Sequence, residues 1–149
     1  MSVILDMPLE KFQRIFIESV PQYRALQLRA VERGLGYLVY DMPYAETLVG
    51  DVETGAVHEF AITTLIDAVY ATAIQTRLDK NYRTATLDLR VDFMRKSTKG
   101  ATVRCEAEVL RIDENTATVR AVAHEGDKRD PLAISTASFA VISMKKASA

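Results

Sequence analysis

The stretch GAVHEFAITTLIDAVYATAIQT, residues 55–76, decides the fold of this chain. It is rich in Ala and in Leu or Ile, it contains no proline, and it has no glycine after Gly55. A run of this length without a helix breaker is typical of an α-helix rather than of a strand. The sequence therefore predicts one long apolar helix over about residues 58–78, the only buried helix expected in the chain.

One carboxylate interrupts this apolar helix. At about 100° per residue, Asp67 points away from the apolar side that Ile62, Leu65 and Val69 form. A carboxylate among apolar neighbours is costly unless it is hydrogen-bonded or has a chemical role. Two interpretations stay open: a surface carboxylate bonded to a neighbouring hydroxyl or backbone group, or a catalytic carboxylate that faces a cleft between two subunits.

Composition and charge restrict the class of protein. The chain has 149 residues, 48% of them hydrophobic and 26% charged, which fits one globular domain over residues 1–149. A net charge of −1 favours neither nucleic acid nor an anionic membrane as partner. With one cysteine and two histidines, we expect no internal disulfide and no metal site. The N-terminus has no signal-peptide pattern and no stretch suits a membrane span, so a cytoplasmic protein is expected.

Outside the long helix the chain reads mainly as β-strand. A short amphipathic helix is predicted over about residues 9–19, a loop over 43–54, and a tail over 145–149. The predicted strands are Tyr23–Glu32, Leu35–Met42, Thr84–Arg95, Thr102–Ile112, Thr116–His124 and Pro131–Met144. Consecutive strands with short turns form an antiparallel sheet, and the apolar helix must be covered. The fold class is therefore α+β, with an antiparallel sheet wrapped around one long central helix.

The strand Thr84–Arg95 has the most regular alternation of the chain. It places Leu87, Leu89 and Val91 on one face and Thr86 on the other. In this architecture the strand lies at a sheet edge, where its free backbone groups invite pairing with a second copy. We therefore expect a homodimer with a continuous sheet, or a dimer of such dimers.

The order of these elements resembles the hotdog fold, and particular residues resemble the PaaI-like acyl-CoA thioesterases. That family has a glycine, a histidine three residues later and an acid nine residues after the histidine, which correspond to Gly55, His58 and Asp67. The strand end from Phe93 to Gly100 resembles the family's aromatic-x-Arg segment with its following glycine. The resemblance covers roughly residues 50–142.

The resemblance implies an enzyme that hydrolyses an acyl-CoA, or a related acyl thioester, to a free acid and a thiol. Asp67 would be the general base or nucleophile, His58 would orient the carbonyl or stabilise the helix start, and Thr86 would lie near the attacking water. The residues implied in substrate binding are Gly55, Glu59, Phe60, Thr63, Arg95 and Lys96. Among these, the cations Arg95 and Lys96 would meet the phosphates of coenzyme A, unless they only form a solvated strand face. No cofactor is implied beyond the coenzyme A of the substrate.

The sequence departs from the family pattern at the helix start. The two glycines that usually follow the histidine are Glu59 and Phe60, and the asparagine often found six residues before it is Val52. In the family these glycines let a thioester carbonyl approach backbone N–H groups. The departures leave two alternatives to the enzyme: a non-catalytic hotdog protein that binds acyl-CoA or another acyl ligand, and a scaffold dimer without a small ligand.

Overall fold

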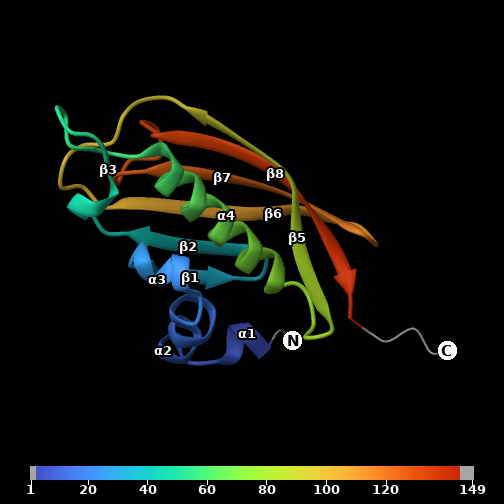
Figure 1. Cartoon of the computed structure of the whole chain (residues 1–149). Helices are drawn as coiled ribbons and strands as arrows, with labels where there is room; N and C mark the ends of the chain where they lie inside the picture. Colours follow the sequence, from blue (N-terminus) through green and yellow to red (C-terminus); the bar gives the residue numbers. More distant parts are fainter. Residues whose placement is uncertain (1–2, 145–149) are drawn as a thin grey trace.

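A computed structural model describes residues 3–144 as a six-stranded sheet that wraps one long helix (Figure 1). The helical segments are α1 (Val3–Asp6), α2 (Leu9–Phe12), the π-helical η1 (Gln13–Glu18), α3 (Pro21–Ala25), the 3-10 turn η2 (Glu46–Leu48) and α4 (Glu59–Gln75). The strands are β1 (Arg29–Gly34), β2 (Tyr37–Met42), β3 (Val49–Asp51), β4 (Ala56–Val57), β5 (Tyr82–Phe93), β6 (Val103–Ile112), β7 (Thr116–His124) and β8 (Ala133–Ser143). The large sheet has the order β1-β2-β6-β7-β8-β5 and all its pairs are antiparallel. The predicted fold class is confirmed.

Helix α4 is the predicted central helix, with 17 residues. Leu65, Ile66, Val69 and Ile74 are buried on it, since the sheet curls around the helix. The sheet residues that face α4 are often small, and those of the central strands β6 and β7 include Cys105, Ala107, Ala121 and Ala123. Small side chains there let the helix lie close to the sheet without leaving voids.

The N-terminal segment differs from the prediction. The predicted helix over residues 9–19 is α2 continuing into η1. The predicted strand Tyr23–Glu32 is wrong in its first half, because Pro21 opens the short helix α3 and β1 begins only at Arg29. Proline at a first helical turn favours a helix start, and this preference outweighed the short Leu alternation.

The predicted loop over residues 43–54 also contains regular structure. It includes η2 and β3, and β3 pairs with β4 just before α4. The His58 N–H donates to the Leu48 carbonyl at 2.7 Å, which ties this small hairpin to the start of the helix. The hairpin therefore positions the N-terminus of α4.

Strand β5 lies at the edge of the sheet, as predicted, but its alternation is interrupted. The pairing of β5 with β8 shifts register between Thr86 and Asp88, so Leu87 is the extra residue of a β-bulge. A bulge exchanges the two faces of a strand, and Thr86 therefore lies on the helix side while Leu87 is 61% exposed. The predicted placement of Thr86 away from the helix is wrong for this reason.

The helices and the C-terminal tail were also the subject of predictions. Within residues 3–144, every helix is too short or too polar to cross a membrane. The predicted tail, residues 145–149, lies outside the described residues.

Candidate active site

The N-terminus of α4 carries an unoccupied backbone donor. His58 is the N-cap residue: its Nδ1 accepts from the Phe60 N–H at 3.1 Å, and its carbonyl accepts from the Ala61 N–H at 3.0 Å. Within the described chain, the Glu59 N–H has no such acceptor. Because the partial positive charge of a helix concentrates at this end, the Glu59 N–H suits a ligand oxygen that carries negative charge. His58 thus shapes the helix start, while Glu59 supplies the donor.

A cavity of about 180 Å³ surrounds this helix start. Its lining comprises Gly50, Asp51, Ala56, Val57, His58, Glu59, Ile62, Phe93, Arg95, Lys96 and Ser97. Four of the residues that the resemblance implies are therefore together here: His58, Glu59, Arg95 and Lys96. Gly55, Phe60 and Thr63 lie beside the cavity rather than in its lining.

These three neighbouring residues have clear local roles. Gly55 makes the turn before β4 with a φ of +74°, a left-handed conformation that favours glycine. The Phe60 ring is 76% exposed at the first turn of α4 and packs on His58 with 4.8 Å between centroids. Thr63 Oγ1 donates to the Glu59 carbonyl at 3.0 Å within the helix. Of the three, Phe60 offers the largest free surface to a ligand or a second chain.

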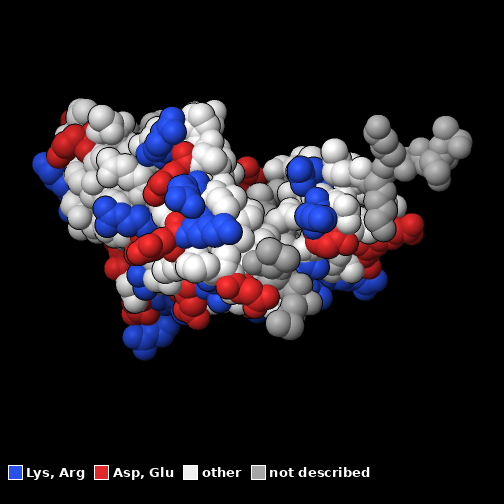
Figure 2. All heavy atoms as spheres, turned by 90° about the horizontal axis from the view of Figure 1, so that it is seen from below, with Lys and Arg blue, Asp and Glu red and all other residues white. Residues whose placement is uncertain are grey.

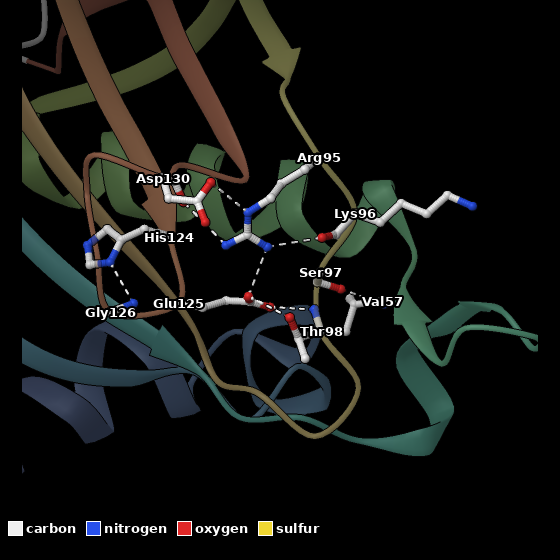
Figure 3. Close-up of polar contacts among 9 residues, drawn as sticks. All are labelled: Val57, Arg95, Lys96, Ser97, Thr98, His124, Glu125, Gly126 and Asp130. Carbon is white, nitrogen blue, oxygen red and sulfur yellow. Dashed lines mark hydrogen bonds and ion pairs between the residues drawn. The ribbon is translucent and has the colours of Figure 1, made fainter.

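Arg95 and Lys96 are both bound to carboxylates of the same chain. Figure 3 shows the two partners of Arg95. Arg95 donates to Glu125 at 3.0 Å and to Asp130 at 3.1 Å. Burial lowers the pKa of Arg95, but hydrogen bonds to these two carboxylates outweigh it, and the pKa is raised. Arg95 therefore holds the turn over residues 125–130 against the end of β5.

Lys96 pairs with Asp51 at the mouth of the cavity. The Lys96 Nζ lies 2.5 Å from Asp51 Oδ2, and this hydrogen bond is the main reason that the pKa of Asp51 falls to about 2. The next residue, Ser97, is buried, and its Oγ accepts from the Val57 N–H at 2.8 Å. In the described part of the chain, Lys99 makes no ion pair; its stem lies over Gly55.

Gly50 allows His58 to lie against β3. A Cβ at Gly50 would be 2.8 Å from both Cα and Cβ of His58, a contact that real side chains do not make. We expect Gly50→Ala to lower the free energy of unfolding by about 1–3 kcal/mol, because overpacking forces the helix start to shift. Urea denaturation measures this loss. Gly34→Ala is the matched control, since its Cβ would meet nothing closer than 3.7 Å; equal stability of the two variants would contradict the close approach.

The second polar position on α4 is Asp67, which is hydrogen-bonded to Thr86 of β5. Thr86 Oγ1 donates to Asp67 Oδ1 at 2.8 Å, and the bulge at Leu87 makes this contact possible. Asp67 is half-buried, and among the described residues Thr86 is the one side chain that donates to its carboxylate. Tyr23 lies within electrostatic reach: burial first, and then the charge of Asp67, raise the pKa of the Tyr23 hydroxyl.

The two polar positions do not meet within one chain. Glu59 and Asp67 lie eight residues apart on α4, about 12 Å along the helix axis. One thioester carbonyl cannot contact the Glu59 N–H and a water on Asp67 of the same helix, because those groups must lie within about 3 Å of the reacting atoms. Glu59 and Asp67 could be named as candidates from the sequence. Tyr23 and Gly50 could not, because their roles depend on tertiary contacts.

No group of three or more His, Cys, Asp or Glu side chains within residues 3–144 has the geometry of a metal site. Burial raises the pKa of the one cysteine, Cys105, which packs in the core.

Known structures share this architecture. A thioesterase from Haemophilus influenzae superposes with a TM-score of 0.85 at 15% identity, over 100% of both chains. The PaaI protein of the phenylacetic acid degradation operon of Escherichia coli gives a TM-score of 0.77 at 16% identity, over 90% of this chain and 93% of that one. A Pseudomonas aeruginosa protein has 29% identity and a TM-score of 0.78, over 89% of this chain and 98% of its own.

The comparison of sequences identifies the family. A search of curated proteins finds no match. The sequence model of the thioesterase superfamily matches residues 54–132, which run from the turn before α4 to the start of β8 and include Asp67 and Thr86. The chain therefore belongs to the thioesterase superfamily, with the hotdog fold of PaaI-like members.

Proposed function

We propose that this protein hydrolyses an acyl-CoA, or a closely related acyl thioester, with a water molecule activated by Asp67. The observation that carries the proposal is the hydrogen bond from Thr86 to Asp67 on the central helix of a thioesterase-superfamily chain. Thr86 fixes one carboxylate oxygen, so that the other faces the site. A half-buried carboxylate held in this way can accept a proton from water.

The chemical steps follow from the two polar positions on α4. Asp67 takes a proton as the oxygen of the water attacks the carbonyl carbon. The carbonyl oxygen becomes negative and accepts a hydrogen bond from the Glu59 N–H. The tetrahedral intermediate then expels the thiolate as the C–S bond breaks, and the proton held by Asp67 passes to the sulfur. The products are a free acid and coenzyme A.

Two copies of the chain complete each site in this proposal. Because Glu59 and Asp67 are about 12 Å apart on one helix, the donor comes from one copy and the base from the other. Such a site requires the start of one α4 helix to lie near the middle of the other, and we propose that the two copies pair along their β5 edges about a two-fold axis to bring this about. Phe60 and Leu87 are large apolar side chains that are 76% and 61% exposed, and this proposal assigns both to the interface.

The phosphates of coenzyme A would meet the cations at the cavity mouth. Lys96 and Lys99 are both exposed, and the stem of Lys99 lies over Gly55, so both can approach a phosphate group. Arg95 contributes positive charge there, although its hydrogen bonds to Glu125 and Asp130 keep it in place. His58 would hold the helix start open for the carbonyl.

A panel of acyl-CoA thioesters tests this function, with thiol release as the measurement. We expect hydrolysis of at least one member of the panel by the purified protein. Thermal stabilisation by acyl-CoA without thiol release would instead support a non-catalytic acyl-binding protein. Absence of both effects would leave only a scaffold role.

A further inference from the structure

A second, larger hollow lies at the other end of α4. A groove of about 1600 Å³ runs between the N-terminal segment, the C-terminal half of α4 and the start of β5. Figure 2, which looks at the molecule from below, shows a hollow between a larger and a smaller part of the surface. Ligand sites of ordinary size have roughly 300–1,000 Å³, so this groove has room for more than a small group.

The groove is lined by buried or half-buried apolar side chains from several elements, and its charged side chains are exposed. Phe16 and Tyr23 come from the N-terminal segment, Ala71 and Leu78 from α4 and its end, and Val141 from β8. The exposed charged side chains in the lining are of both signs: Arg77, Asp79, Lys80, Arg83, Asp113 and Glu114. The apolar part of the groove suits a hydrocarbon chain.

The outer wall of the groove is held firmly in place. Arg33 donates to the carbonyls of Ile4, at 2.8 Å, and of Met7, and its guanidinium lies over the Phe12 ring. The Gln13 side chain bridges to Leu28 and Ala30, with both hydrogen bonds at 2.9 Å. These contacts fasten the N-terminal segment to β1, so the wall is part of the fold.

The groove lies next to the Asp67–Thr86 pair. Ala71, which lines it, lies one turn after Asp67 on the same face of α4. Thr84, also in the lining, lies two residues before Thr86 on the same face of β5. Tyr23 lines the groove and lies within electrostatic reach of the Asp67 carboxylate. A thioester carbonyl beside Asp67 would therefore have its acyl group directed toward this groove.

From this continuity we infer that the groove binds the acyl chain of the substrate, and that the substrates are thioesters of medium-length or longer apolar acids. This inference rests on the proposed function, since it takes Asp67 as the position of the reacting carbonyl. The N-terminal wall lies outside residues 54–132, the part that the superfamily model matches. Chain-length selectivity is thus assigned to a segment outside the part that the superfamily model matches.

A series of straight-chain acyl-CoAs tests the inference in the intact protein. We expect kcat/KM to rise from acetyl-CoA to decanoyl-CoA, by up to about fourfold for each methylene that becomes buried. Ala71→Leu places a larger side chain at the start of the groove. It should lower kcat/KM for decanoyl-CoA at least about tenfold more than for acetyl-CoA. Ala25→Leu, on the exposed end of α3, is the matched control and should leave the profile unchanged.

The outcomes separate this inference from the proposed function. Hydrolysis that does not depend on chain length, or an equal loss for both substrates in Ala71→Leu, would overturn the groove assignment and leave the thioesterase intact. A change of sedimentation coefficient in Ala71→Leu, with an unchanged chain-length profile, would instead make the groove an interface between copies and would also overturn it.

A binding measurement tests the groove assignment if the protein hydrolyses no thioester. If no thioester is hydrolysed, the proposed function fails. The groove assignment is then supported if decanoyl-CoA raises the melting temperature more than acetyl-CoA does, and if Ala71→Leu removes this difference. It is overturned if the two ligands act equally.

Discussion

Asp67→Asn will lower kcat for the best acyl-CoA substrate by about 10²–10⁴-fold, because an amide cannot take the proton of the attacking water. The fold should be unaffected, since Asn has nearly the same shape and can still accept the hydrogen bond that Thr86 donates at 2.8 Å. Steady-state thiol release measures the effect. KM should change much less than kcat, because the carboxylate acts on the water rather than on the acyl group.

Asp127→Asn is the matched control for this prediction. The Asp127 carboxylate bonds only to Arg129 within its own turn, as far as the described residues go, so its neutralisation should leave kcat unchanged. Hydrolysis at the wild-type rate in Asp67→Asn would remove this carboxylate from the mechanism. It would leave Asp67 as a structural partner of Thr86, which is the other interpretation that the sequence allows.

Glu59→Pro will lower kcat by about 10²–10³-fold, because it removes the one backbone N–H at the helix start that has no acceptor in the described chain. Proline fits this position without disrupting the helix. Glu59 is the first residue of α4, where the proline ring is well tolerated. His58, the residue before it, has φ −64° and ψ 137°, which is the extended conformation that a following proline requires.

Glu59→Ala separates the donor from the carboxylate. This variant keeps the N–H but removes the acidic side chain, so we expect Glu59→Pro to lose at least about 100-fold more activity than Glu59→Ala. Circular dichroism should give the same helix content for both variants. Equal activity of the two variants would show that another group binds the oxyanion. The N–H of Glu59 would then not be the oxyanion donor.

Much of the fold could be predicted because the residue patterns that determine it are continuous over long stretches of the sequence. An unbroken apolar run with no glycine after Gly55 allows little besides a helix, and strands joined by short turns allow little besides an antiparallel sheet. The position of Thr86 could not be predicted in this way. A bulge adds one residue at Leu87 and exchanges the faces of the strand, yet it leaves no mark in the pattern of residue types.

The contacts of the candidate site residues could not be predicted from the sequence. The spacing of His58 and Asp67 identified the helix start and the carboxylate, since sequence distance along a helix fixes their separation. Whether Arg95 and Lys96 are free or paired depends on Glu125, Asp130 and Asp51, which the fold brings to them from other segments. Such pairings depend on tertiary structure, and no periodicity in the sequence predicts them.

The central claim is that one copy supplies the base and another supplies the oxyanion donor. Co-expression of Asp67→Asn and Glu59→Pro chains with different tags, followed by purification through both tags, tests it most directly. Each mixed dimer then combines both substitutions in one site and leaves the other site intact, so about half of the wild-type activity should return although each variant alone is inactive. Mixed dimers that stay as inactive as either parent would contradict the shared site, and with it the mechanism.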